Sequence, residues 1–120
     1  MAYDPTNPRT WPDATVVIRG GERNVEHLAN VMTLDGSWSV ISERGISFEV
    51  LSAGIRNGKV RRTTLKRVLA AGGTLVPTRN DGPPYHCDLS GLTAAVFDAI
   101  LGPEEDNPVP KASRWRGNDR

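Results

Sequence analysis

The chain has 120 residues and a formal net charge of +1, with 15 Lys or Arg and 14 Asp or Glu. This length predicts one domain, and the near balance of charges excludes a polycation that binds nucleic acid with its whole surface. Cys87 is the only cysteine, so an internal disulfide is excluded and the chain fits a reducing cytoplasm. Residues 1–13 lack the apolar segment of a secretory signal, and no run approaches the roughly 18 apolar residues of a membrane span. We therefore expect a cytoplasmic protein without a membrane partner.

The first third of the chain predicts an arm, a strand and a helix. Residues 1–13 contain three prolines and are expected to form an irregular arm whose end is pinned to the body by Trp11. Residues 14–19 include three successive branched apolar side chains, which is typical of a central strand buried on both faces. In residues 22–34, apolar side chains recur at positions i, i+3, i+4 and i+7, which predicts a helix.

Two strands and a turn are predicted next. Residues 37–42 form the first strand, and residues 46–52 form the second. In the second strand, apolar residues alternate with polar ones, which indicates one buried face. The apolar residues of that alternation are Ile46, Phe48 and Val50. The Asn-Gly pair at 57–58 predicts a tight turn, followed by a short extended piece at 59–62.

The second half of the chain predicts two helices with a hairpin between them. The first helix covers residues 64–71 and is closed by two glycines. The strands at 74–78 and 84–89 form the hairpin, and Pro77 places the first strand at an edge of the sheet because proline cannot donate to a ladder. Ser90 is the predicted N-cap of the last helix.

Together these elements predict an α+β fold, with about three helices around a small, mainly antiparallel sheet. The predicted domain spans residues 14–102. Residues 103–120 are acidic, then proline-rich, then basic, and we expect them to form a disordered tail. Trp115 lies between two arginines in this tail. It is either a residue that stacks on a base or docks to a partner, or the one tryptophan of a loose hydrophilic segment.

A run of cations is the first candidate functional feature. No acidic residue occurs between Glu49 and Asp81, and the seven cations of this interval are Arg56, Lys59, Arg61, Arg62, Lys66, Arg67 and Arg79. Lys66 and Arg67 point away from the apolar face of their helix, so we expect an exposed basic face. Such a face attracts nucleic-acid phosphates or an acidic partner, and a solvated helix face is the simpler alternative.

His86 and Asp88 are the candidate catalytic pair. At positions i and i+2 of a strand, both side chains leave the same face of the sheet. A histidine is an effective general base or acid near neutral pH, and a neighbouring carboxylate would orient its ring. Next to a basic helix, this pair suits metal-free RNA cleavage. The alternative is that both residues lie on the wet face of a half-exposed strand.

The segment that contains these residues resembles a toxin family. The sequence TTLKRVLAAGGTLVPTRNDGPPYHCDL, residues 63–89, is similar to the core of HicA-type mRNA interferase toxins, in which a short helix, a glycine step and a strand precede a catalytic histidine. The resemblance implies a catalytic role for His86. The family's Gly-Ser-His triplet is absent, because Pro83, Pro84 and Tyr85 separate the glycine from the histidine. The same segment, with NPVP at 107–110 after the last helix, also resembles C-terminal toxin modules of bacterial polymorphic toxins, and this resemblance spans about half of the chain.

Arg19 carries a second resemblance. The sequence VVIRGG, in which an arginine ends an early strand, resembles the first motif of arginine-type ADP-ribosyltransferases, and SWSVIS at 37–42 could take the place of their serine-rich motif. That family implies binding of a nicotinamide dinucleotide by Arg19 and requires a catalytic glutamate late in the chain. Glu104 and Glu105 lie in the predicted tail and do not fit that place.

The sequence thus predicts a small bacterial toxin-like or effector-like protein that cleaves RNA without a metal or other cofactor, with His86 and Asp88 as catalytic residues and the cation run as the phosphate site. Its candidate partners are RNA and an antitoxin or immunity protein. One alternative is a non-catalytic module that binds a protein or nucleic acid through its basic face. The other is an ADP-ribosyltransferase-like domain, which requires a cleft around Arg19 with a carboxylate opposite.

Overall fold

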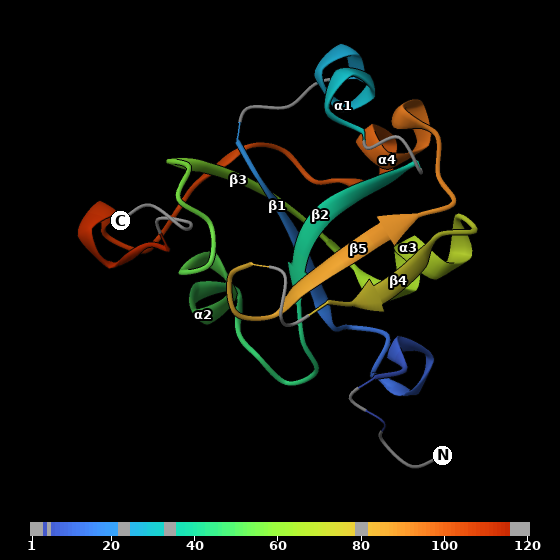
Figure 1. Cartoon of the computed structure of the whole chain (residues 1–120), viewed down its shortest axis with the longest axis horizontal. Helices are drawn as coiled ribbons and strands as arrows, with labels where there is room; N and C mark the ends of the chain where they lie inside the picture. The colour runs from blue at the N-terminus through green and yellow to red at the C-terminus, as the bar shows by residue number, and fades with distance from the viewer. Residues whose placement is uncertain (1–3, 5, 22–24, 33–35, 79–81, 116–120) are drawn as a thin grey trace.

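A computed structural model describes residues 4, 6–21, 25–32, 36–78 and 82–115 of the chain. These residues form a six-stranded sheet with four α-helices, which confirms the predicted α+β class and adds one helix to the expected number. Figure 1 shows α1, α3 and α4 gathered at one side of the sheet and α2 at the other.

All neighbouring strands of the sheet are antiparallel, and their order is β4-β5-β2-β1-β3-β6. The first strand of the chain lies inside the sheet and the strand that contains Pro77 lies at an edge, so both predictions are confirmed. The strands are β1 (Val16–Gly20), β2 (Ser37–Ser42), β3 (Lys59–Thr64), β4 (Thr74–Pro77), β5 (His86–Ser90) and β6 (Glu105–Asp106).

The helices are short and mostly begin at a side-chain cap. Thr64 accepts a hydrogen bond from the backbone N–H of Arg67, and Thr93, rather than the predicted Ser90, accepts one from Val96. The α-helices are α1 (Val25–Val31), α2 (Phe48–Ser52), α3 (Leu65–Ala70) and α4 (Ala94–Ile100), and the 3-10 helices are η1 (Pro8–Thr10) and η2 (Lys111–Ser113).

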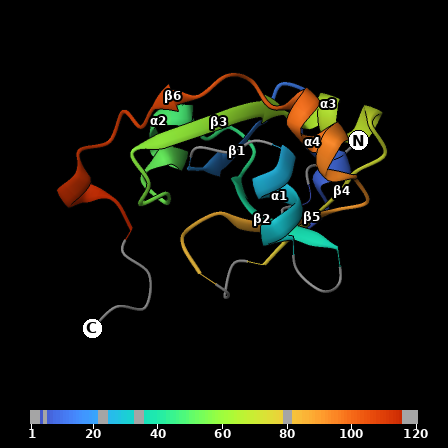
Figure 2. The same ribbon diagram turned by 90° about the horizontal axis from the view of Figure 1, so that it is seen from above.

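Two hydrophobic clusters cover the two faces of the sheet. Because side chains alternate along a strand, neighbouring residues such as Val17 and Ile18 belong to different clusters. The larger cluster packs the sheet against α1, α3 and α4, and in it the rings of Trp38 and Phe97 lie 4.8 Å apart. The smaller cluster packs the sheet against α2 and Ile55. Figure 2 shows α2 near one end of the molecule and α3 and α4 near the other.

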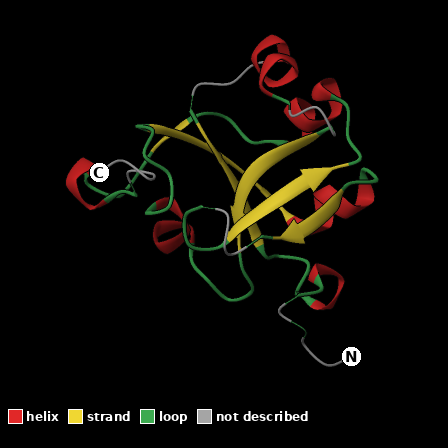
Figure 3. Cartoon of the chain, viewed as in Figure 1, coloured by secondary structure: helices red, strands yellow, loops and turns green. Residues whose placement is uncertain are grey.

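The prediction of a strand at 46–52 is wrong, because these residues form helix α2 (Figure 3). The hydroxyl of Ser47 accepts a hydrogen bond from the backbone N–H of Val50 at 3.2 Å and so caps the helix. Leu51 is buried while Val50 is half exposed. Phe48, Leu51 and Ile55 therefore follow a helical period that the shorter alternation at 46–50 obscured.

The C-terminal segment 103–115 packs on the domain, although the sequence predicted a disordered tail from residue 103. Strand β6 pairs with β3, and the ion pair with Lys59 lowers the pKa of the Asp106 carboxyl below its ordinary value. The buried side chain of Asn107 donates hydrogen bonds to the carbonyl oxygens of Ser52, Ile55 and Asn57. Residues 116–120 of the predicted tail lie outside the described residues.

The N-terminal arm is anchored as expected. Trp11 is buried in the larger cluster, and its indole N–H donates to the carbonyl oxygen of Asp4 at 3.0 Å. Helix η1, which precedes Trp11, lies beside the edge strand β4.

Candidate functional site

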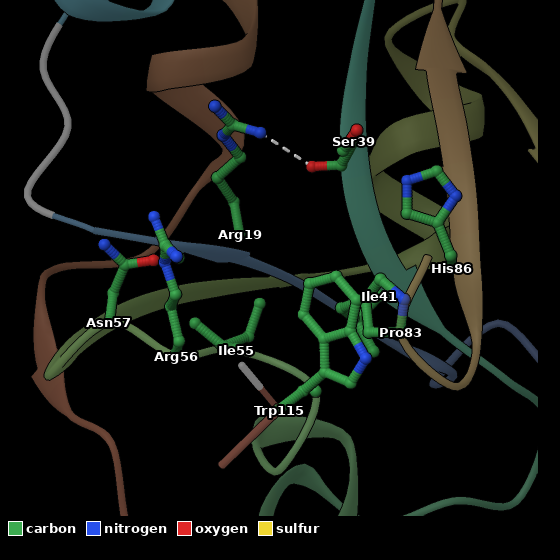
Figure 4. A pocket seen from close by; sticks show the side chains of 11 residues that line it. Arg19, Ser39, Ile41, Ile55, Arg56, Asn57, Pro83, His86 and Trp115 are labelled. Carbon is green, nitrogen blue, oxygen red and sulfur yellow. Dashed lines mark hydrogen bonds between the residues drawn. The ribbon is translucent and has the colours of Figure 1, made fainter. Parts of the chain in front are cut away.

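A cleft of about 460 Å³ opens where β1 and β2 diverge. The two strands pair at Val17 with Ser42 and at Ile18 with Ile41, and Figure 1 shows them separating beyond that point. The cleft is lined by residues of both strands, of the loop after α2, of the turn before β5 and of the C-terminal segment: Arg19, Gly20, Ser39, Ile41, Gly54, Ile55, Arg56, Asn57, Pro83, His86 and Trp115. Figure 4 shows these side chains facing one space.

Arg19 crosses the opening between the two strands. It follows directly after the last β1 residue that pairs with β2, and its Nη1 donates to the carbonyl oxygen of Ser39 at 2.8 Å (Figure 4). This hydrogen bond joins the two strands beyond the last residue pair of their ladder. The guanidinium group is therefore held at the cleft by β2.

His86 lies on the opposite wall, at the start of β5. The residue is 7% exposed, and its Nδ1 is hydrogen-bonded to the hydroxyl of Thr78. The preceding residue, Tyr85, has a φ of 67°, which is uncommon for a residue with a side chain and stores backbone strain. The strained turn and the Thr78 contact together fix the imidazole against the cleft.

The loop after α2 supplies the other cation of the cleft. Arg56 and Asn57 lie in this loop, which is held by the hydrogen bonds from Asn107. The backbone N–H of Trp115 donates to the carbonyl oxygen of Ala53 at 2.7 Å, so the C-terminal segment returns to the same loop. Residues more than 50 positions apart in the chain thus form one wall.

The described lining of the cleft carries positive charge. Two guanidinium groups, those of Arg19 and Arg56, line it, and none of the lining residues within the described part of the chain is an Asp or Glu. Asn57 and Ser39 add polar groups, and Ile41, Ile55 and Trp115 add apolar surface. A concave site of this size, with few polar groups on apolar walls, suits a small ligand or part of a larger one.

Only one member of the predicted catalytic pair is among the described residues that line the cleft. His86 and Asp88 share one face of β5, as their spacing predicted, but His86 lines the cleft and Asp88 does not. Asp88 is half-buried in β5, opposite Ser39 of β2. Nδ1 of the His86 ring is hydrogen-bonded to the Thr78 hydroxyl.

Three of the predicted phosphate-binding cations form ion pairs with acidic side chains of the same chain. Lys59 pairs with Asp106 at 2.6 Å, and Arg62 pairs with Glu105 at 2.9 Å. Arg61 is buried and pairs with Asp98 at 2.7 Å. These ion pairs could not be predicted from the local sequence, because each acidic partner follows its cation by more than 30 positions.

The remaining cations are distributed over different parts of the molecule. Lys66 and Arg67 are exposed on α3, as predicted, while Arg56 lines the cleft. Arg79 lies outside the described residues. Among the described cations of the predicted segment, Arg56 lines the cleft, and Arg62 and Arg67 line another pocket together.

No sequence pattern connects several of the cleft residues. Arg19 and Trp115 carry separate signals, and Asn57 is part of a turn dipeptide. No local signal joins them, because they come together through the sheet order and through the return of the C-terminal segment. The Asn-Gly pair at 57–58 predicted a tight turn but not what the turn faces.

Among the described residues, no cluster of three or more His, Cys, Asp or Glu is arranged to hold a metal ion. Within that same part of the chain, no helix has the length and apolar character needed to cross a membrane. No protein-family model, no curated protein and no solved structure matches this chain, so the case for a function rests on the cleft itself.

Proposed function

We propose that the protein binds RNA in this cleft and cleaves it without a metal ion, with His86 as the group that transfers the proton. Arg19 and Arg56 would contact oxygen atoms of the phosphate group at which the reaction occurs. The observation that best supports this proposal is that these two guanidinium groups and the imidazole come from three separate segments and line one cleft.

The reaction has a defined balance of bonds and protons. The 2′-oxygen of a ribose forms a bond to the adjacent phosphorus, and the bond from phosphorus to the 5′-oxygen breaks. His86 takes the proton of the 2′-hydroxyl, and the departing 5′-oxygen gains a proton from water. The products are a 2′,3′-cyclic phosphate and a 5′-hydroxyl. Arginines next to the phosphate stabilise the negative charge that develops on its oxygens.

Cleavage of a labelled single-stranded RNA by purified protein tests this proposal. Because a positioned general base contributes about 10²–10⁴ in rate, we expect His86→Gln to lower the rate by at least about 100-fold. Arg56→Ala should lower it too, since the phosphate loses a contact. The control is Arg9→Ala, an exposed cation of η1 that does not line the cleft, which should cleave like the wild type.

The folding of each variant is checked by circular dichroism, and the product ends are identified by mass spectrometry. Intact RNA after incubation with folded wild type, or equal cleavage by folded His86→Gln, would reject the proposed reaction. The toxin class adds a cellular expectation: wild-type expression arrests bacterial growth, His86→Gln relieves the arrest, and an antitoxin or immunity protein would neutralise the wild type.

The second candidate is ADP-ribosyl transfer, and one observation favours it. Arg19 and Ser39, which correspond to the two motifs of the sequence resemblance, meet in the same cleft. That reaction also needs a carboxylate opposite the arginine, and the described lining residues provide none. It therefore ranks second. Release of nicotinamide from nicotinamide adenine dinucleotide by wild type, lost in Arg19→Ala, would favour transfer over RNA cleavage.

A further inference from the structure

Trp115 forms part of the cleft from the far end of the described chain. Figure 4 shows its indole among the lining side chains, with Arg56 and Ile55 on one side and Pro83 and His86 on the other. The residue is half-buried, whereas Trp11 and Trp38 are 4% and 1% exposed in the core. Trp115 is thus the tryptophan of the described chain that presents ring surface to the cleft.

The backbone of Trp115 and the side chains of nearby residues in the C-terminal segment hold the indole in this place. Its backbone N–H bonds to the carbonyl oxygen of Ala53 at 2.7 Å, so its Cα is fixed to the loop after α2. The guanidinium group of Arg114 donates to the carbonyl oxygens of Val109 and Arg56. The segment is anchored further back by the buried side chain of Asn107. These contacts limit the conformational freedom that ligand binding would otherwise have to remove.

An aromatic face beside guanidinium groups matches the parts of a nucleotide. The guanidinium groups of Arg19 and Arg56 suit a phosphate, while the indole offers a flat apolar surface on which a base can stack. Stacking needs a base that has left its own stack. In an RNA duplex the bases are paired and stacked on one another, so this contact is open to single strands, loops and ends.

We propose that Trp115 stacks on a base of the bound RNA and makes the cleft selective for single-stranded RNA. This inference rests on the proposed function, since it takes RNA to be the ligand. It adds a specificity-determining residue that lies outside the residues of the proposed reaction. The C-terminal segment is then part of the binding site, rather than an appendage of the domain.

Binding measurements separate the stacking contact from the phosphate contact. The probe is a fluorescent single-stranded hexanucleotide of 2′-O-methyl RNA, which cannot be cleaved because its 2′-oxygen carries no proton. A second hexanucleotide lacks one base at a chosen position, and each position is tested in turn. Since stacking contributes about 1–3 kcal/mol per base, Trp115→Ala should weaken binding of the intact strand by about 5–150-fold.

Trp115→Phe should keep most of the affinity, because a smaller aromatic ring still stacks. On the strand whose missing base is the stacked one, wild type and Trp115→Ala should bind equally. Tripolyphosphate, which has no base, should compete equally well in both proteins, and Arg56→Ala should weaken its competition. The duplex form of the hexanucleotide should bind wild type less tightly than the single strand.

The outcomes distinguish the two proposals. Arg56-dependent RNA binding that Trp115→Ala leaves unchanged, or equal affinity for duplex and single strand, overturns the stacking inference and leaves the cleavage proposal standing. No RNA binding by folded wild type overturns both. Should Trp115→Ala not fold, Trp115→Phe together with the base-deletion series gives the answer, because a strand that loses no affinity at any missing base has no stacked base.

Discussion

At the scale of single residues, Arg61 is a cation that the sequence predicted to bind phosphate and that forms a buried ion pair within the fold. Its side chain is 9% exposed, and its Nη1 lies 2.7 Å from a carboxylate oxygen of Asp98. Its other donors bond to the carbonyl oxygens of Gly102, Asp98 and Leu101. The last carbonyls of a helix have no partner within it, so Arg61 caps the C-terminal end of α4.

Replacement of Arg61 should therefore affect stability. Removing one partner of a buried, hydrogen-bonded ion pair costs about 3–5 kcal/mol, and the partial exposure of Asp98 places Arg61→Ala near the lower end, at about 3 kcal/mol. Arg62→Ala is the matched control on the same strand, with a half-exposed pair to Glu105 and a cation–π contact to Phe48. It should cost about 1 kcal/mol or less. Urea unfolding measures both, and equal costs would contradict the capping role.

At the scale of elements, α2 shows a local signal that outweighed an alternating pattern. Ser47 has the extended backbone of an N-cap, and the helix that follows buries Leu51. The cap satisfies a backbone donor that an isolated turn would leave to water. Helix α2 leads directly into the loop that holds Arg56, so this short helix also sets one wall of the cleft.

Ser47→Ala should destabilise the protein by about 1 kcal/mol, because the hydroxyl that accepts from Val50 is lost. Ser47→Asp is the conservative variant and should stay within a few tenths of a kcal/mol of wild type, since a carboxylate caps as well. The midpoint of urea unfolding gives the comparison. An alanine variant as stable as the aspartate variant would show that the cap does not determine this helix.

At the scale of the whole molecule, the distribution of charge distinguishes binding in the cleft from binding over a basic face. Two arginines line the cleft, while Lys59 and Arg62 are paired at the surface with acidic groups. Binding of a single strand releases counterions in proportion to the number of phosphate contacts, so the salt dependence of affinity counts these contacts.

With two contacts, log Kd plotted against log salt should rise with a slope of about 1.4, which is 0.7 per contact for single strands. Seven contacts from the whole cation run would give a slope of about 5. The measurement uses the methylated hexanucleotide between 50 and 300 mM salt, by fluorescence anisotropy. A slope near 5 would favour the non-catalytic basic-face module and would count against the cleft.

The fold was largely predictable from the sequence because its signals are local. The branched run in β1, Pro77 in the edge strand β4, and the apolar period that leads into α3 or α4 each report on a few adjacent residues. Such patterns show which face of an element is buried, whichever other elements cover that face. One exception is α2, which lies where an apolar alternation and a helical period overlap within seven residues. Another is the segment 103–115, whose composition predicted disorder although it packs on the domain.

The site was predictable only in part, since it depends on residues that the chain brings together over long distances. The sequence identified His86, Arg19 and Arg56 as candidate functional residues. An imidazole can transfer protons and a guanidinium group can bind phosphate in any fold. Only the tertiary structure placed them in one cleft, paired Arg61 with Asp98, and brought Trp115 into contact with the loop after α2. The physical reason is that burial and ion pairing depend on which strands lie side by side, and no local pattern records that order.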